Sequence, residues 1–238
     1  LHLDDNTSPV ETPADSYLPL DEDGEPPLEL YNYASVVGML GYLQGHSRAD
    51  ITFAVSQVSR YTFCPKRSHE LALERIGRYL KGTIKEGLIL KPDHETDKFK
   101  IDIYVDAAFA SGWGTELGTN PDSVKSRTGF IVEVMGCPVI WCSKLQPCIA
   151  TSTMESEYTA LSMSLRAAIP LMAVTEAINK GLEFIHHRLL TFKATVHEDN
   201  MGALRLSQLE PGRNTPRSKF YALKLQWFRS WLKPKCIE

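Results

Sequence analysis

Residues 101–106, "IDIYVD", alternate apolar and polar side chains and end on a carboxylate. A period of two is typical of a strand with one buried face. Asp106, at the exit of this strand, has two interpretations. Aspartate is common at strand ends because it begins turns; alternatively, the strand holds Asp106 rigidly as a metal ligand. The second interpretation requires partner acids elsewhere in the chain.

The segments after this strand predict a sheet with helices packed on it. A glycine-rich loop reaches residue 126, "RTGFIVEVMGCPVIWCSK" has the pattern of a hairpin with Gly136 in its turn, and "STMESEYTALSMSLRAAI" predicts a long helix. "KATVHEDN" predicts a short strand that ends in acid, and "MGALRLSQ" predicts a short helix after it. This order indicates an α/β fold of the α+β sandwich type.

Three helical patterns precede the sheet region. They are "YASVVGMLGYLQGHS", "RADITFAVSQVSRYTFCP" and "KRSHELALERIGRYLKGT". We therefore expect an acidic linker over residues 1–30, a small helical module over residues 31–95 and the α/β domain over residues 96–238. A chain of 238 residues that is 43% hydrophobic is long enough to bury a core in such a domain.

Composition argues against a membrane span and against a cysteine-based metal site. The most apolar stretch, "TALSMSLRAAIPLMAVTEAI", contains Arg166, Pro170 and Glu176, which favours a buried helix. The five cysteines form no CxxC pair, so we expect reduced core cysteines of an intracellular protein. The chain starts with neither Met nor the basic and apolar regions of a signal peptide, which is consistent with a fragment.

Charge is distributed unevenly along the chain. Residues 1–30 hold nine acids and no Lys or Arg, leaving 26 basic and 20 acidic side chains in the rest. The acidic, proline-rich start is expected to be a weakly ordered linker. Arg75, Arg78 and Lys81 lie on the third predicted helix, where they either contact nucleic-acid phosphates or form an ordinary solvated face.

Three acids at the ends of predicted elements are candidates for one site. Asp106 follows the first strand, Glu155 lies in the first turn of the long helix, and Asp199 follows the next strand. Parallel neighbouring strands bring their ends to one edge of a sheet, and a helix across the sheet brings its first turn there. Clustered carboxylates need cations, and hard oxygen donors suit Mg²⁺ or Mn²⁺. Two such ions, roughly 4 Å apart, activate a water and stabilise the leaving oxygen of a phosphodiester.

Each acid also has a purely structural interpretation. Asp106 is then a turn residue, Glu155 favours the helix dipole, and Asp199 caps the following helix. The occurrence of all three in this order favours the shared site. Glu157 is expected to lie outside it, because two residues turn a helix by about 200°, so Glu155 and Glu157 cannot both face one site.

Residues 31–238 resemble the Pol polyprotein of copia-type retrotransposons, from the end of the reverse transcriptase into the ribonuclease H domain. "YASVVGMLGYLQGHSRADITFAVSQVSRY" is similar to that family's Y-(R)-S-x-(V/I)-G-x-L-x-Y-L…(T/S)-R-P-D-I…A-V…S-R-(F/Y), and "HELALERIGRYLKGT" resembles H-x-x-A-x-(K/R)-R-I-x-R-Y-L-K-G-T. "YVDAAFA" resembles Y-x-D-A-D-(W/F)-A. "SRTGFIVEVMGCPVIWCSKLQPCIATSTMESEYTAL" and "EDNMGAL" resemble the motifs around the family's catalytic Glu and second catalytic Asp.

The resemblance implies a function and a fold. Asp106, Glu155 and Asp199 match the catalytic acids that bind Mg²⁺ (or Mn²⁺) and cut the RNA strand of an RNA–DNA hybrid. The implied fold is the mixed five-stranded sheet of ribonuclease H, preceded by a thumb- or connection-like module in which Arg75, Arg78 and Lys81 guide the hybrid. The implied partners are the hybrid and the palm and fingers of the reverse transcriptase, with no membrane. The implied location is cytoplasmic, in virus-like particles where the element is active.

The sequence also departs from the family pattern. Ala108 stands where a second Asp is common, Ala49 replaces a Pro, and Phe220 replaces a His. The family's fourth metal-site Asp lies in a motif beyond residue 238, so weak cleavage, if any, is expected of the chain as given, and enzymatic activity is left open. Two alternatives stay open: a catalytically degenerate transposon remnant that at most binds nucleic acid, and an integrase-like nuclease, which would need its Glu on a later helix.

Overall fold

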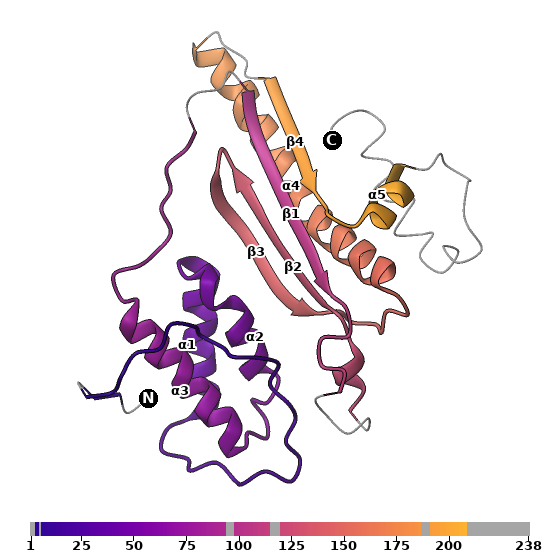
Figure 1. Cartoon of the computed structure of the whole chain (residues 1–238). Helices are drawn as coiled ribbons and strands as arrows, with labels where there is room; N and C mark the ends of the chain where they lie inside the picture. The colour runs from indigo at the N-terminus through magenta and orange to yellow at the C-terminus, as the bar shows by residue number, and fades with distance from the viewer. Residues whose placement is uncertain (1–2, 5, 94–97, 115–119, 187–190, 209–238) are drawn as a thin grey trace. The chain divides into compact units, whose positions relative to one another are not determined.

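A computed structural model describes residues 3–4, 6–93, 98–114, 120–186 and 191–208 of the chain. The chain divides into two compact units (Figure 1). The first comprises residues 1–88 and 110–125, and the second comprises residues 89–109 and 126–238. Each unit has a hydrophobic core of its own, and each is described separately.

The first unit is built from three helices, as the apolar spacing predicts. They are α1 (Tyr33–His46), α2 (Thr52–Ser59) and α3 (Arg67–Gly82), and the short 3-10 helices η1 (Ala49–Ile51) and η2 (Pro121–Val124) belong to the same unit. Asn32 caps α1 by accepting a hydrogen bond from the backbone N–H of Ser35. Ile51, Leu73 and Ile76 are almost fully buried, so the core lies between α1, α2 and α3.

Two motifs of this unit meet around one buried guanidinium. The Arg48 side chain is 7% exposed and forms an ion pair with Asp50 at 2.7 Å. It also donates hydrogen bonds to the carbonyl and the hydroxyl of Thr83, just after α3. Tyr79 donates its hydroxyl proton to the same Asp50 carboxylate. The "SRADI" and "RYLKGT" segments are therefore tied together by polar contacts, since a buried charge must be paired.

The N-terminal residues differ from the weakly ordered linker expected of their composition. They have no helix or strand among the described residues, but Ala14 and Leu18 pack against the core of the first unit. The backbone N–H groups of Leu28 and Glu29 donate to the buried carboxylate of Glu70 at 2.8 and 3.1 Å. Composition missed this arrangement because the contacts use the backbone of the segment, whose hydrogen-bonding groups are the same in every sequence.

The second unit contains a four-stranded mixed sheet in the order β3-β2-β1-β4. The strands are β1 (Lys98–Ala108), β2 (Arg127–Val134), β3 (Cys137–Leu145) and β4 (Thr191–His197). β1 is antiparallel to β2 and parallel to β4. Strands β2 and β3 form the predicted hairpin, whose turn holds Met135 and Gly136 at φ values of 53° and 77°. Such left-handed backbone favours glycine and confirms the turn position.

Helix α4 (Thr153–His186) packs along one face of this sheet (Figure 1). Tyr158, Leu161 and Leu165 form an apolar stripe on this predicted helix and are buried with Ile101 and Ile103 of β1. By length and composition alone, Thr153–Gly181 could cross a membrane. Its burial in the core of the unit supports the expected buried helix instead.

The fold class expected from the sequence, α/β with a mixed sheet, is confirmed. Among the described residues the sheet has four strands, whereas the ribonuclease H resemblance implies five. The short helix α5 (Met201–Gln208) follows β4 as predicted. Phe220 and the rest of residues 209–238 lie outside the described part of the chain.

Candidate metal centre

The register of the sheet places two acids level with each other. β1 and β4 are parallel, and Tyr104 pairs with His197 at the end of their ladder. Asp106 and Asp199 each lie two residues further along, so the strand ends bring both carboxylates to the same edge. Both are exposed. The predicted meeting of Asp106 and Asp199 is therefore what the structure shows, because parallel neighbours end at one edge of a sheet.

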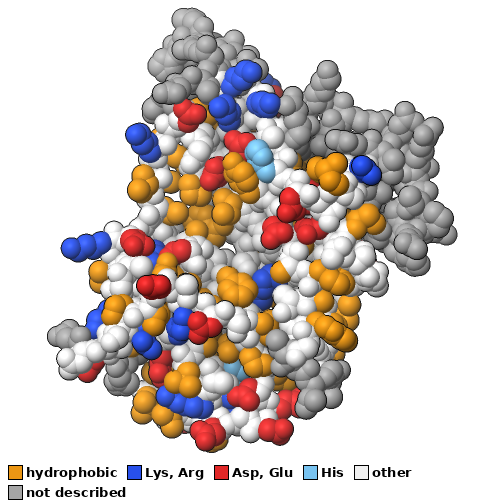
Figure 2. All heavy atoms as spheres, in the orientation of Figure 1, with side chains coloured by type: hydrophobic (Ala, Val, Ile, Leu, Met, Phe, Trp, Pro, Cys, Tyr) orange, Lys and Arg blue, Asp and Glu red, His pale blue; other side chains and the backbone are white. Residues whose placement is uncertain are grey.

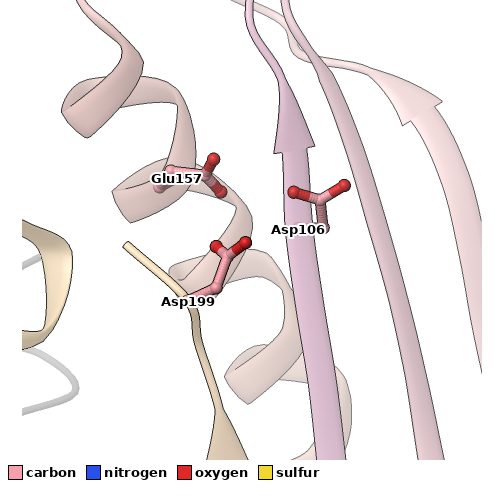
Figure 3. A group of neighbouring side chains, drawn as sticks. All are labelled: Asp106, Glu157 and Asp199. Atoms are coloured by element: carbon pink, nitrogen blue, oxygen red, sulfur yellow. The ribbon is translucent and has the colours of Figure 1, made fainter. Parts of the chain in front are cut away.

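The third acid at this edge is Glu157, from the beginning of α4. Ligand oxygens of Asp106, Glu157 and Asp199 all lie within 4.8 Å of one another. Figure 3 shows the three carboxylates directed into a common space from β1, α4 and the segment after β4. Figure 2 shows acidic side chains gathered on the surface over the end of β4. Glu157 is only 7% exposed, whereas the two aspartates face solvent.

The choice of Glu155 for this position is corrected by the structure. Its carboxylate turns back to Thr151, accepting hydrogen bonds from the backbone N–H at 2.8 Å and from Oγ1 at 2.9 Å. Glu155 thus satisfies the backbone N–H and the hydroxyl of Thr151 before the start of α4, which is a structural role. The helical rotation between Glu155 and Glu157 does allow only one of them at the site, and that one is Glu157.

A pattern in the sequence could have identified Glu157. Ala160, Ser164 and Ala168 lie three, seven and eleven residues after it, and all three are fully buried. These spacings place them on the same side of the helix as Glu157. Small residues repeated on one side indicate where a helix approaches its neighbour closely, so an acid in line with them lies against the sheet. The interpretation above rested on the place of Glu155 in the first turn of the helix and did not use these small residues.

Gln146 fixes the start of α4 beside the sheet. Its side chain is almost fully buried and donates one hydrogen bond to Thr128 Oγ1 of β2 and another to the carbonyl of Ser156. Ser156 precedes Glu157 directly. The amide of Gln146 therefore holds the helix backbone next to the acid at a defined height above the sheet. The sequence motif "SKLQ" thus has a positioning role that spacing did not reveal.

Electrostatics in the cluster favour a bound cation. Burial and, after it, the negative charges of Glu198, Asp106 and Asp199 raise the pKa of Glu157 to about 7, against a hydrogen bond from the Ala107 backbone. Burial, together with the charges of Asp199 and Asp106, likewise raises the pKa of Glu198 to about 7, against a hydrogen bond from the Asn200 N–H. Among the described residues, Oε2 of Glu157 and Oε2 of Glu198 are buried without a hydrogen-bond partner. A divalent cation would supply the missing partner and neutralise the charge.

Asp199 is not the cap of the helix that follows. Asn200 has that role, because its Oδ1 accepts hydrogen bonds from the backbone N–H groups of Gly202 and Ala203. The carboxylate of Asp199 is therefore left to face Asp106 and Glu157. The donor set of three carboxylates, two exposed and one buried, fits Mg²⁺ or Mn²⁺, which prefer oxygen ligands and keep several waters.

The predicted nucleic-acid-binding residues lie in the other unit. Arg75, Arg78 and Lys81 are half-buried on α3, and each donates hydrogen bonds to the N-terminal segment. They are therefore not the freely solvated face considered as the alternative. Their expected contact with phosphates stays a prediction.

Comparison with known proteins finds retrotransposon Pol polyproteins among the relatives of the chain. The chain is 28% identical, over 98% of its length, to the "Retrovirus-related Pol polyprotein from transposon TNT 1-94" of Nicotiana tabacum. It is 34% identical, over 55% of its length, to the corresponding protein from transposon RE1 of Arabidopsis thaliana. The chain spans only 16% and 8% of these two relatives. No family model matches.

One solved structure is similar over much of the chain. It is described as the structure of the foamy viral protease-reverse transcriptase dRH in complex with ds DNA. The likeness has a TM-score of 0.45 and 11% identity, and it covers 87% of this chain and 31% of the other.

Proposed function

We propose that Asp106, Glu157 and Asp199 form a ribonuclease H site for the RNA strand of an RNA–DNA hybrid, because the chain is similar over most of its length to Pol polyproteins of retrotransposons. The observation that carries this proposal is the convergence of three carboxylates at one sheet edge, one of them buried with an unpartnered oxygen. Such an arrangement is costly for the fold alone, because like charges and desolvation both oppose it. It is useful if the carboxylates together bind divalent cations.

Each acid contributes differently to such a site. Asp106 is held by the hydrogen bonds of β1, which pairs with β2 through Gly129 opposite Asp106. Glu157 is fixed by the packing of α4 and by the hydrogen bond that Gln146 makes to the preceding carbonyl. Asp199 is free to face the site because Asn200 caps α5. Ligands on rigid elements keep their geometry during a reaction better than ligands on loops.

The bound cations would activate a water molecule and stabilise the leaving oxygen of the phosphodiester. The residues of the chain then have a positioning role only, and no nucleophilic side chain is required. The exposure of Asp106 and Asp199 leaves the open side of the cluster accessible to a polynucleotide. Selection of RNA over DNA would rest on contacts to the 2′-hydroxyl group.

The remaining partners of this region follow from its relatives and belong to the same proposal. A region that corresponds to 16% of a Pol polyprotein would work beside the reverse transcriptase that makes the hybrid. The alternative is a remnant that binds nucleic acid and no longer cleaves it. The two differ in one observable, the release of RNA fragments.

The test is cleavage of a labelled RNA–DNA hybrid in Mg²⁺ and in Mn²⁺. In a form of the chain extended through the motif that holds the family's fourth metal-site Asp, we expect the RNA strand to be cut and duplex DNA to be spared. Asp106→Asn should lower the rate by about a hundredfold or more, because a ligand and its charge are lost. Asp102→Asn is the matched control, since Asp102 lies on the same strand but contacts His197 instead. An intact hybrid in both metals would support the remnant, and equal loss in both variants would contradict the site.

A further inference from the structure

The basic face of α3 is covered by the N-terminal segment of the same chain. Lys81 Nζ donates to the backbone carbonyls of Asp4 and Thr7 at 2.6 and 2.9 Å. Arg78 Nε donates to the carbonyl of Ser8 at 2.8 Å. The two cations that come last in α3 are thus bound to oxygens of residues 4–8.

The next cation along the helix continues this pattern. Arg75 donates from Nε to the carbonyl of Thr12 at 3.1 Å and from Nη2 to Thr12 Oγ1 at 2.9 Å. It also forms an ion pair with Asp15 at 2.6 Å. We refer to residues 4–15, of which residue 5 lies outside the described part of the chain, as the strap. Asp4, Ser8 and Thr12 follow one another in the strap, and they contact Lys81, Arg78 and Arg75 in that order. The strap therefore lies antiparallel to α3.

The strap offers α3 the chemistry that a nucleic-acid backbone would offer. Every group that these three cations contact in the strap is an oxygen acceptor, and one of them is a carboxylate. Residues 1–30 contain nine acids and no Lys or Arg. Lys and Arg side chains contact phosphate oxygens with the same donors. A strap and a phosphate backbone cannot use the same N–H groups at once.

The strap also fits closely against the end of the helix. Gly82 is the last residue of α3, and a Cβ atom added there would lie 2.8 Å from Cβ of Pro9. A separation this short between carbon atoms forces one of them to move. The proline ring is rigid, so the backbone of the strap would have to shift with it. The glycine therefore permits the strap to lie on the helix.

We propose that the strap is an intramolecular competitor for nucleic acid at α3. The phosphate backbone binds Arg75, Arg78 and Lys81 only when residues 4–15 leave them, so the chain limits its own affinity for polyanions. The choice of an RNA–DNA hybrid as partner rests on the proposed function, but the competition itself does not involve the metal centre. Binding is therefore measured in the presence of a chelator, where the outcome is independent of cleavage.

The central variant is Gly82→Ala, which displaces the strap and changes no charge. Gly45→Ala is its matched control, because Gly45 lies in α1 with nothing within 4 Å of an added Cβ. Fluorescence anisotropy with a labelled hybrid should show about three- to tenfold tighter binding for Gly82→Ala at low salt and no change for Gly45→Ala. Each recovered phosphate contact should steepen the dependence of log Kd on log salt by roughly 0.7–0.9.

A deletion variant tests the same competition between the strap and nucleic acid independently of Gly82→Ala. Removing residues 1–12 frees Arg78 and Lys81 from the strap and leaves Arg75 with Asp15 as its strap partner, while keeping Ala14 and Leu18 in the core. Circular dichroism checks that the helices persist. The deletion should bind the hybrid at least as tightly as Gly82→Ala, and adding Arg78→Ala should remove most of the gain. If the deletion and Gly82→Ala both bind like the unaltered chain, the strap is not a competitor. A gain that survives Arg78→Ala would place the polyanion elsewhere.

Discussion

The carboxylate of Glu157 is buried against like charges, so the stability of the metal-free protein should depend on pH. Its pKa is raised to about 7, whereas the unfolded chain titrates near 4.5. Between these values the unfolded state releases a proton that the folded state keeps, so the free energy of unfolding falls as pH rises from about 4.5 to 7. Below and above this window the contribution of Glu157 is constant.

Glu157→Gln should remove part of this pH dependence. We expect the variant to be more stable than the unaltered chain at pH 7.5 in a chelator, by about 1–2 kcal/mol, with little difference at pH 4. Urea denaturation at the two pH values measures both effects. Equal stability of the two proteins at pH 7.5 would mean that burial and the neighbouring charges do not raise the pKa of Glu157.

Single residues also show what the sequence could and could not predict. Asp106 and Asp199 were identifiable because a carboxylate near the end of a strand has a fixed place at the sheet edge. Strand alternation could not distinguish Glu155 from Glu157, because both lie near the start of the same helix and an acid at either position is typical there. The contact between Glu155 and Thr151 depends on how the chain enters α4, which no periodicity describes.

The buried guanidinium of Arg48 should be important for the first unit. Arg48→Met keeps the apolar part of the side chain but removes the ion pair with Asp50 and the hydrogen bond to the carbonyl of Thr83. We expect a loss of about 2–3 kcal/mol in the free energy of unfolding, measured with urea. Lys85→Met is the control, because Lys85 is exposed, and should change stability by less than about 0.5 kcal/mol. Similar losses in both would show that the ion pair contributes nothing specific.

At the scale of elements, the segment between β3 and α4 should affect both the stability of the second unit and the Mn²⁺ affinity of its site. Gln146→Leu removes two buried hydrogen bonds and leaves the Ser156 carbonyl and Thr128 hydroxyl without this donor. Stability should fall by about 1–3 kcal/mol, and Mn²⁺ affinity should fall with it because the turn that carries Glu157 is loosened. Calorimetric titration at a temperature where the variant is folded separates the two effects. Unchanged Mn²⁺ affinity would limit Gln146 to a structural role.

Element types were easier to predict than their surroundings. The hairpin of β2 and β3 and the stripe of α4 follow from period-two and helical apolar spacing, which reflect burial on one face. The N-terminal segment has neither pattern, because its order comes from backbone and side-chain hydrogen bonds to α3. The acidic composition of this segment predicted weak order, whereas in this chain the segment contacts the basic side chains of α3.

At the scale of the whole molecule, the two units have separate cores and should respond separately to substitution. Arg48→Met acts in the first and Gln146→Leu in the second, so their effects on the free energy of unfolding should add within about 0.5 kcal/mol. Arg48→Met should also leave Mn²⁺ binding unchanged. Urea titration of the double variant is the measurement. A combined effect far from the sum would show that the units fold as one cooperative body.

The most direct test of the metal centre compares the same substitution at two positions in α4. Glu157→Gln and Glu155→Gln each remove one carboxylate. Calorimetric titration with Mn²⁺ measures the effect of each substitution on metal binding. Because only Glu157 lies with Asp106 and Asp199, Glu157→Gln should weaken Mn²⁺ binding at least tenfold, while Glu155→Gln should bind like the unaltered chain. Weaker binding for Glu155→Gln alone, or equal binding by all three proteins, would contradict a metal site built from Asp106, Glu157 and Asp199.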